Sequence, residues 1–204
     1  MLNLTKEENK ILIEYFPFLQ PRNVWTDKIF EDYDYDYILG VGDLPDGWER
    51  LFLLYCKHLK IELDKFNFTD KFRFSQIKEK YGDMRLYNNG YPKDSKCFDL
   101  ESIYSHLSTY ICQTCGKPAK YMSQGWIEQF CRDCFIKTFP NENPDKTYCK
   151  KGNRSYKVTI IGFSPEEGKT KREVPCKKYW DEYLKCLKMD KEKFLKYVMN
   201  SEVN

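Results

Sequence analysis

Four cysteines in two Cys-x-x-Cys pairs are the residues whose types and spacing most directly indicate chemistry. Cys112 and Cys115 form the first pair, and Cys131 and Cys134 form the second pair after fifteen intervening residues. Each pair can wrap a tight knuckle with both sulfurs facing one point, and a hairpin between the pairs can bring the knuckles together. Four thiolates complete a tetrahedron, so we predict one structural Zn²⁺ and no open position for catalysis.

The residues around these pairs fit a zinc ribbon over residues 111–137. Gly116 follows the first knuckle, where a positive φ is usually required. We expect one strand over Ala119–Met122, a turn over Ser123–Gly125 and a return strand over Trp126–Phe130. This hairpin would place the second knuckle opposite the first.

The other cysteines and the two histidines show no such spacing. A second metal site formed by Cys149, Cys176 and Cys186 is an open alternative, although metal clusters normally contain a closely spaced pair. We expect His58 and His106 inside helices, as ordinary surface or core residues rather than ligands. Nine cysteines are an odd number, and the N-terminus has no signal pattern, so we expect a cytoplasmic location without a disulfide framework. No run of about 18 apolar residues is present, so no membrane partner is expected.

Charge is nearly balanced over the chain but unevenly distributed along it. The formal net charge is +3, which gives little support to nucleic-acid binding by the chain as a whole. Between Asp27 and Asp46 there are seven acidic residues and one lysine, whereas residues 145–204 contain 15 Lys and Arg against 9 Asp and Glu. The two regions either complement each other in the fold or mark two surfaces for partners.

An acidic segment is the first candidate interaction surface. Asp32, Asp34 and Asp36 alternate with tyrosines, so an extended chain would place three carboxylates on one face and three rings on the other. This pattern has three interpretations: an exposed edge strand, an acidic surface for a basic partner, or a divalent-cation site.

A charged hairpin over residues 72–88 carries the second candidate surface, formed by Lys78, Lys80, Arg85 and Tyr87. Lys80-Tyr81-Gly82-Asp83 is expected to form its turn. The surface fits either a solvated strand face with weak cross-strand ion pairs, or a basic and aromatic surface that contacts phosphate or a partner protein.

Helices should surround these segments and give an α+β fold: helices and a β-hairpin packed with the four-cysteine ribbon, plus a C-terminal β-α extension. The expected helices, with their capping residues, are 5–16 (Thr5 with Glu8), 46–60 (Asp46 with Glu49) and 99–110 (Asp99). The expected regions are 1–110 (α+β), 111–137 (ribbon), 138–155 (linker) and 156–204, with a strand over Tyr156–Phe163 and helices after Pro175 that break near Asp190.

Five short motifs follow one another in the middle of the chain. They are Asp46-Gly47-Trp48, the run from Gln76 to Tyr87, the run from Cys112 to Ala119, Gly125-Trp126-Ile127, and Cys131-Arg132-Asp133-Cys134. With these motifs, residues 15–137 resemble a family of small uncharacterised proteins that are frequent in bacteriophages and bacterial mobile elements. The resemblance implies a phage or mobile-element origin and a role in host takeover or in countering host defences.

These observations favour a non-enzymatic, zinc-binding interaction protein that binds a host protein. The sequence contains no Gly-rich phosphate loop and no nucleophile elbow. Abundant Tyr and Trp with a near-neutral charge favour a protein partner over nucleic acid. The first alternative is a nucleic-acid-binding zinc-ribbon protein that uses the basic C-terminal region, and the second is a metal-dependent hydrolase or nuclease.

Overall fold

The computed structural model describes residues 2–123, 125–143, 149–150, 156–164 and 168–200. Its helices are α1 (Lys6–Tyr15), η1 (Pro17–Leu19), η2 (Asp46–Trp48), α2 (Glu49–Asp64), α3 (Cys97–Ser108), α4 (Arg132–Thr138), α6 (Lys177–Cys186) and α7 (Lys191–Val198), of which η1 and η2 are 3₁₀ helices. Its strands are β1 (Phe74–Lys80), β2 (Asp83–Asn88), β3 (Tyr121–Met122), β4 (Gln129–Phe130), β5 (Cys149–Lys150), β6 (Lys157–Ser164) and β7 (Gly168–Pro175). The predicted α+β class is confirmed.

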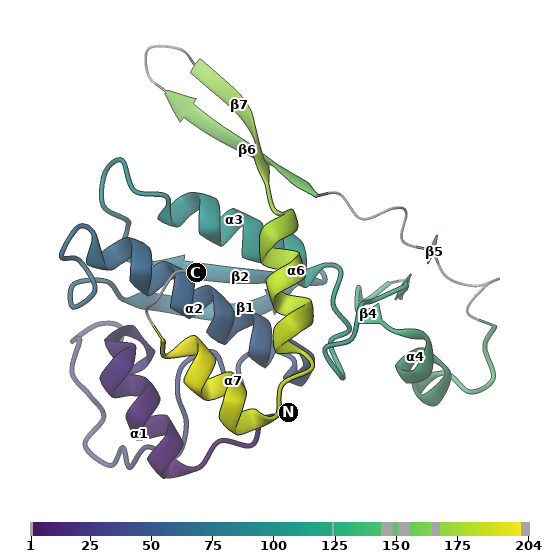
Figure 1. Cartoon of the computed structure of the whole chain (residues 1–204), viewed down its shortest axis with the longest axis horizontal. Coiled ribbons are helices and arrows are strands. Elements are labelled where there is room, and N and C mark those ends of the chain that lie inside the picture. Colours follow the sequence, from purple (N-terminus) through teal and green to yellow (C-terminus); the bar gives the residue numbers. More distant parts are fainter. Residues whose placement is uncertain (1, 124, 144–148, 151–155, 165–167, 201–204) are drawn as a thin grey trace.

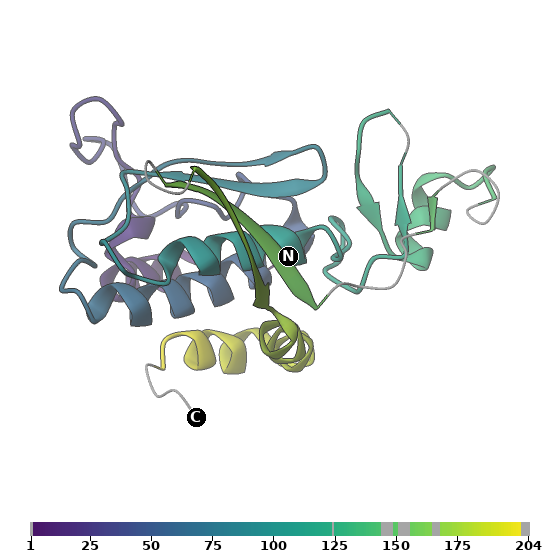
Figure 2. The ribbon, with the colours of Figure 1, turned by 90° about the horizontal axis from the view of Figure 1, so that it is seen from above.

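The main body has three layers, which Figure 1 and Figure 2 show from two directions. The β1–β2 hairpin forms one layer, α2 and α3 form the middle layer, and α6 and α7 form the third, with α1 beside them. None of the helices in the described ranges combines the length and the apolar composition that crossing a bilayer requires.

Helix α2 lies at the centre of this arrangement because it is buried around most of its circumference. Leu51, Phe52, Tyr55, Leu59 and Leu63 are fully buried in it. A helix with so wide an apolar surface has to be enclosed by other elements. Here α3, α6 and α7 all contact α2.

The start of α2 differs from the prediction. Neither η2 nor α2 has a side-chain cap, so the capping box expected from Asp46 and Glu49 is wrong. The carboxylate of Glu49 instead accepts a hydrogen bond of 2.5 Å from the backbone N–H of Leu2, because the N-terminal segment packs there. The capping box of Thr5 and Glu8 at α1 is confirmed.

The β1–β2 hairpin is confirmed, with a tighter turn than expected. The antiparallel strands pair up to the turn, so only Tyr81 and Gly82 form the loop. Both residues have positive φ, 56° and 74°, as two-residue hairpin loops with the twist of the strands require. The register buries Ile77, Met84 and Leu86 on the face toward α3.

The C-terminal region begins with a hairpin rather than the single strand predicted over Tyr156–Phe163. β6 corresponds to that strand, and β7 pairs with it along its whole length. Val158 and Ile160 are buried where β6 contacts α3. From β7, Arg172 forms a double ion pair with Asp99 of α3. The predicted cap at Asp99 is therefore wrong, because this carboxylate lies inside the first turn and faces β7.

Helices α6 and α7 complete the main core. Trp180, Tyr183 and Phe194 are buried in the same apolar cluster as α2 and α3. The helical break predicted near Asp190 is confirmed. Asp190 caps α7 by accepting a hydrogen bond of 2.8 Å from the backbone N–H of Lys193.

The ribbon region protrudes from one end of the body (Figure 2) and has a small core of its own. Tyr121, Phe130 and Phe135 form that core. The chain leaves the main core after Ile111 and returns with β6, so the ribbon is an insertion in the body. Within the predicted linker of residues 138–155, β5 pairs with β3 and adds a third strand to the ribbon sheet.

Candidate metal centre

The first knuckle is a closed loop between Ile111 and Pro118, which form an antiparallel bridge. The backbone N–H of Cys112 donates to the carbonyl of Lys117 at 2.8 Å, and the N–H of Gly116 donates to the carbonyl of Cys112 at 3.0 Å. Gly116 has a φ of 77°, which confirms the expected left-handed conformation. These bonds fix the backbone that carries the first two sulfurs.

The second knuckle follows the predicted hairpin, whose strands β3 and β4 are short but present. Cys131 is the N-cap of α4, and its Sγ accepts a hydrogen bond from the backbone N–H of Cys134 at 3.5 Å. The prediction did not include α4, because sequence rules for helix starts depend on Ser, Thr, Asp and Asn caps. A cysteine held by its neighbours takes that place here.

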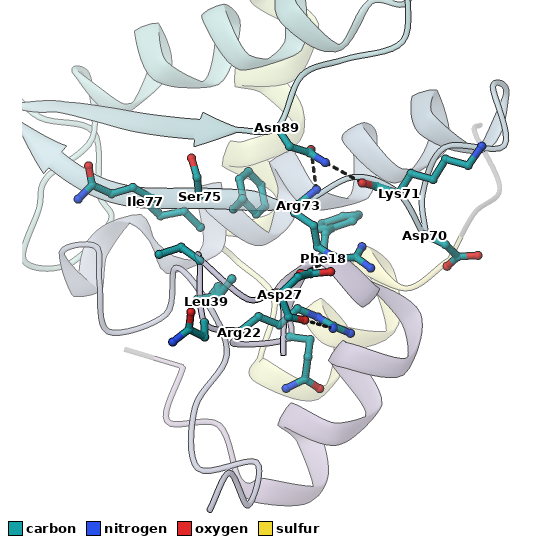
Figure 3. Close-up of a pocket in the computed structure, with 15 residues that line it drawn as sticks. Phe18, Arg22, Asp27, Leu39, Asp70, Lys71, Arg73, Ser75, Ile77 and Asn89 are labelled. Carbon is teal, nitrogen blue, oxygen red and sulfur yellow. Dashed lines mark hydrogen bonds and ion pairs between the residues drawn. The ribbon is translucent and has the colours of Figure 1, made fainter. Parts of the chain in front are cut away.

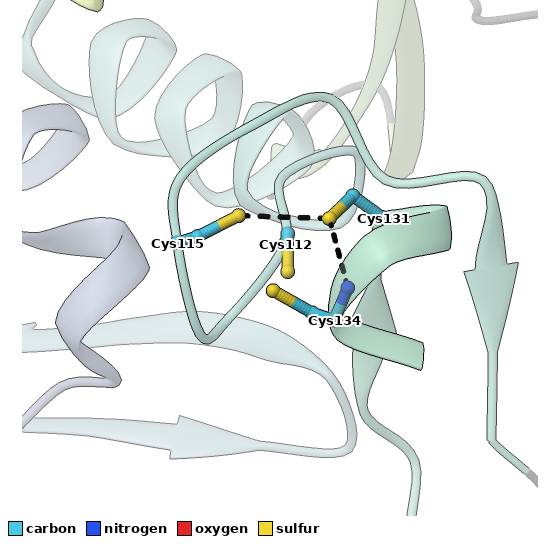
Figure 4. Close-up of side chains that lie close together, drawn as sticks. All are labelled: Cys112, Cys115, Cys131 and Cys134. Atoms are coloured by element: carbon cyan, nitrogen blue, oxygen red, sulfur yellow. Dashed lines mark hydrogen bonds between the residues drawn. The ribbon is translucent and has the colours of Figure 1, made fainter. Parts of the chain in front are cut away.

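The four sulfurs converge on one point between the knuckles (Figure 4). All lie within 4.8 Å of one another, and the Sγ atoms of Cys115 and Cys131 are 3.6 Å apart. Four sulfurs at about 2.3 Å from one tetrahedral ion would be about 3.8 Å from each other. Cys112, Cys115, Cys131 and Cys134 can therefore hold one metal ion with little adjustment.

The surroundings of the sulfurs set how readily they lose their protons. Burial raises the pKa of the Cys115 thiol to about 11 and also raises the pKa of Cys134. At Cys112 burial also opposes ionisation, but backbone N–H groups of Cys131, Cys115 and Thr114 donate to its sulfur and lower its pKa overall. A metal ion binds thiolates, so when it binds it has to displace the protons of the thiols whose pKa is raised.

The alternative second metal site has no counterpart among the side chains that the structure describes. Across the described residues, the four cysteines are the only group of three or more His, Cys, Asp or Glu side chains close enough to share an ion. Cys176 and Cys186 are buried at opposite ends of α6. The side chain of Cys149 lies outside the described part of the chain.

The histidines occupy helices, as predicted. His58 of α2 faces α3 and α6, where its Nδ1 is 2.7 Å from the hydroxyl of Tyr104 and its Nε2 is 3.1 Å from the carboxylate of Glu182. His106 packs edge-on against the ring of Tyr110. Neither histidine belongs to the four-cysteine group.

The turn before α2 braces the first knuckle against the main body. The backbone N–H of Gly47 donates to the carbonyl of Gln113 at 2.8 Å, and the indole N–H of Trp48 donates to the carbonyl of Ile111 at 3.1 Å. The contact at Gly47 is so close that a Cβ there would lie 2.1 Å from the carbonyl oxygen of Cys112. Glycine is therefore the residue that allows this approach of two backbones.

A tyrosine from α6 contacts the same knuckle from another side. The hydroxyl of Tyr183 donates to the carbonyl of Gly116 at 2.6 Å, and Tyr183 is fully buried. Its partner lies 67 positions earlier in the chain, so no sequence periodicity could have revealed the pair. Tyr183 thus ties the C-terminal region to the metal centre.

The tip of the β1–β2 hairpin meets the ribbon hairpin. The side-chain amide of Gln129 donates to the carbonyl of Gly82 at 3.4 Å. A Cβ at Gly82 would lie 2.5 Å from that amide nitrogen and 2.7 Å from the side chain of Ile127. Gly82 was identified from sequence only as a turn residue, and its second role is to let the ribbon approach.

The basic candidate surface is assembled on the outer face of the hairpin. Lys78 lies directly opposite Arg85 in the register, with Tyr87 beside them, and Lys80 lies toward the turn. The ammonium of Lys78 is 4.9 Å from the ring centroid of Tyr87. Arg85 forms an ion pair of 3.1 Å with Asp83. Directly opposed like charges disfavour strand pairing, so the basic character of this face lowers the stability of the hairpin.

The acidic candidate surface does not have the expected form. Residues 32–37 form no strand, and the chain bends at Tyr35 and Asp36 because Tyr35 adopts a left-handed conformation with a φ of 56°. The alternation of carboxylates and rings on two faces is therefore wrong. Lys6 of α1 lies 2.7 Å from both Asp34 and Asp36, although all three aspartates of the segment are exposed. Two of the three carboxylates are thus engaged by a lysine of the same chain.

Comparisons with protein-family models, with curated proteins and with solved structures find no match to this chain. The resemblance to phage and mobile-element proteins therefore stays a prediction. Residues from the motifs that carry it nevertheless meet in space, since Gly47 contacts the first knuckle and Gly82 lies against Ile127.

Proposed function

We propose that this chain is a non-enzymatic interaction protein that holds one Zn²⁺ at its four cysteines and binds a partner protein. The convergence of four sulfurs from two braced knuckles is the observation that carries this proposal. Four thiolates in a tetrahedral arrangement suit Zn²⁺, which has no geometric preference of its own and a strong affinity for sulfur.

The proposed role of the zinc is structural. Four cysteine ligands fill the tetrahedron, whereas a catalytic zinc keeps one position for water or substrate. The residues around the sulfurs serve to position backbone: Gly47, Trp48 and Tyr183 all make hydrogen bonds to the first knuckle. We therefore assign the metal to the shape of the ribbon and to its attachment to the body.

Exposed aromatic and apolar side chains support a protein partner. In the loop before the acidic segment, Trp25 is 92% exposed, and Val24, Ile29 and Phe30 are also exposed. Large apolar side chains that cluster on a surface mark interaction sites, and Trp is enriched among the residues that dominate binding energy. This loop lies beside the base of the hairpin, where Asp27 is 3.8 Å from Arg73.

The basic face of the hairpin indicates the charge of the partner. Lys78, Lys80 and Arg85 project from one face, with Asp83 as the acidic group that offsets them. Charge complementarity then favours a partner with an acidic rim around an apolar patch. We propose that this partner is a host protein, and this part of the proposal rests on the resemblance of the short motifs alone.

Metal analysis tests the structural half of the proposal. The purified chain should contain one zinc per chain by mass spectrometry of the elements, and Cys131→Ser should lose it. Cys56→Ser removes a fully buried thiol outside the group and should keep the zinc. In hydrogen exchange, a chelator should remove protection from residues 111–138, because ribbons this small depend on their metal. A metal-free protein, or Cys131→Ser with a full zinc content, would contradict the assignment.

Affinity capture tests the partner. The tagged chain should retain a host protein, and the purified pair should bind again when reconstituted. Trp25→Ala should weaken that binding at least tenfold, whereas Trp126→Ala, which removes another largely exposed tryptophan on the ribbon, should not. Equal binding by the unaltered protein, Trp25→Ala and Trp126→Ala would argue against the loop as the interface.

A nucleic-acid-binding function is the second candidate because lysines gather on the C-terminal region. Lys169 and Lys171 of β7 and Lys177 and Lys178 of α6 are exposed. Phosphate contacts release counterions, so binding through these lysines would weaken steeply with salt, with a slope of about −0.7 to −0.9 for each phosphate. A shallow salt dependence favours the protein partner.

A further inference from the structure

A pocket lies between the loop that follows η1 and the outer edge of β1 (Figure 3). Its volume is about 540 Å³, within the range of about 300–1,000 Å³ that small-molecule sites occupy. The zinc ligands and the two predicted interaction surfaces do not line it. The pocket borders the loop proposed to bind a partner, since Val24 lines it, but neither the zinc centre nor the basic face of the hairpin uses it.

The floor of the pocket is apolar. Phe18 and Phe74 are buried and meet edge to face, with ring centroids 5.8 Å apart. Leu39 and Ile77 add two more apolar side chains to the lining. Such a surface gains free energy by covering an aliphatic or aromatic body, because both lose contact with water.

Two arginines stand over this floor with donors to spare. Each guanidinium carries five N–H donors. Nη1 of Arg22 donates to the carbonyl of Asp27 at 2.8 Å, and Nη1 of Arg73 donates to the carbonyl of Phe72 at 2.7 Å. The Nε atoms of both arginines are buried and make no hydrogen bond to any atom that the structure describes. Asp27 is 3.8 Å from Nε of Arg73, which is beyond hydrogen-bond distance.

Hydrogen bonds to the backbone hold both walls of the pocket in place. Asn89 accepts from the backbone N–H of Arg73 at 2.9 Å and donates to the carbonyl of Lys71 at 2.8 Å. In the facing loop, the N–H of Asp27 donates to the carbonyl of Asn23 at 2.8 Å. Asp27 has a φ of 53°, an uncommon conformation that these bonds maintain. Both arginines are thus anchored by backbone that the fold has fixed.

The charge of the lining favours an anion. Arg22, Lys71 and Arg73 face the pocket together with Asp27 and Asp70, which leaves a net positive charge. Guanidinium groups pair with carboxylate and phosphate oxygens through two parallel hydrogen bonds, which adds both affinity and orientation.

We propose that this pocket binds a small organic anion, in which a phosphate or carboxylate group is joined to an apolar or aromatic body. The anionic group accepts hydrogen bonds from Arg22 and Arg73, and the body packs on Phe18, Phe74 and Ile77. Binding is non-covalent and independent of the zinc.

Isothermal titration of the zinc-loaded protein with phenyl phosphate tests this assignment, with benzoate as the carboxylate probe. At least one of the two should bind saturably at one site per chain. Arg73→Gln and Arg22→Gln should each weaken binding at least tenfold, and Arg73→Lys should recover only part of the loss, because lysine lacks the planar fork. Lys10→Gln removes an exposed charge on α1, away from the pocket, and should bind like the unaltered protein.

Two further probes separate the parts of the site. Phenol lacks the anionic group and inorganic phosphate lacks the apolar body, so each should bind at least tenfold more weakly than phenyl phosphate. Melting curves and zinc content establish that each variant is folded. If Arg73→Gln does not fold, Arg22→Gln provides the test in its place. No saturable binding of either anion, or equal binding by the arginine variants and the unaltered protein, would overturn the proposal and leave the zinc assignment untouched.

Discussion

Adding one methyl group at Gly47 should damage both the stability of the protein and its hold on the metal. A Cβ at this position would lie 2.1 Å from the carbonyl oxygen of Cys112, 2.6 Å from the backbone nitrogen of Gly116 and 2.8 Å from the carbonyl oxygen of Gln113. Real Cβ atoms almost never approach other atoms within 3.0 Å. All three obstacles are backbone atoms of the first knuckle, so no side chain can rotate away and the knuckle itself has to move.

The expected cost follows from these contacts. Forcing extra atoms into a well-packed site costs about 1–3 kcal/mol. Moving the knuckle also weakens the hydrogen bonds from Gly47 and Trp48, each worth about 1 kcal/mol. We therefore expect Gly47→Ala to lower the free energy of unfolding by about 3–4 kcal/mol. For a chain of this length, each kcal/mol lowers Tm by about 2–4 °C, so the melting point should fall by roughly 10 °C.

Circular dichroism melts with one equivalent of zinc measure the stability, and competition with a chromophoric chelator measures zinc affinity. In excess chelator the variant and the unaltered protein should melt closer together, because the knuckle that the methyl group distorts is then no longer held by metal. Gly90→Ala is the matched control: its Cβ would meet nothing within 4 Å, although its φ of 106° is unfavourable for alanine. It should cost about 1–2 kcal/mol of backbone strain and leave zinc affinity unchanged. If Gly47→Ala kept the Tm and zinc affinity of the unaltered protein, the reasoning about the braced knuckle would be wrong.

Two further predictions concern a hydrogen bond and a carboxylate. Tyr183→Phe leaves the buried carbonyl of Gly116 without its donor and should destabilise the protein by about 1–3 kcal/mol in urea unfolding, with weaker zinc binding, whereas Tyr81→Phe at an exposed position should change neither. Burial opposes ionisation of Glu62, but Lys65 and the backbone N–H of Lys96 outweigh it and lower its pKa. A lowered folded-state pKa stabilises the fold above the ordinary Glu range and loses this effect as pH falls through the folded value. Glu62→Gln should therefore be less stable than the unaltered protein at pH 7 and approach it below about pH 4, and exposed Glu14→Gln should follow the unaltered protein at both values.

Local chemistry explains what could be predicted from the sequence. The spacing of Cys112 and Cys115 already places two sulfurs on one tight loop, so the ligands were identified without any knowledge of the body. The β1–β2 turn was equally accessible, because Tyr81-Gly82 can adopt the positive φ values that a two-residue loop requires. Such features depend on residues only a few positions apart.

Several of the failed predictions have the opposite property, because the structure there depends on a partner far away in the sequence. Asp99 is a good capping residue by type, but α3 begins two residues earlier, at Cys97, and the carboxylate of Asp99 pairs with Arg172 of β7. β7 itself is rich in lysine and lacks the apolar alternation of a half-buried strand, so it was missed. The bond from Tyr183 to Gly116 and the pocket between Arg22 and Arg73 join segments that sequence alone does not place together.

The ribbon lies in the sequence between the two parts of the chain that form the main body, and this order has a consequence for how the protein is made. All four ligands are synthesised before the chain reaches residue 135, whereas the main core needs Trp180, Tyr183 and Phe194 from its last quarter. At about 5–20 residues per second, the stretch from Cys134 to Val198 takes several seconds to emerge from the ribosome. During that interval the four cysteines of the nascent chain can already bind a metal ion, although α6 and α7, which cover α2, have not yet been synthesised. The order of translation thus allows the four-cysteine centre to form before the main core is complete.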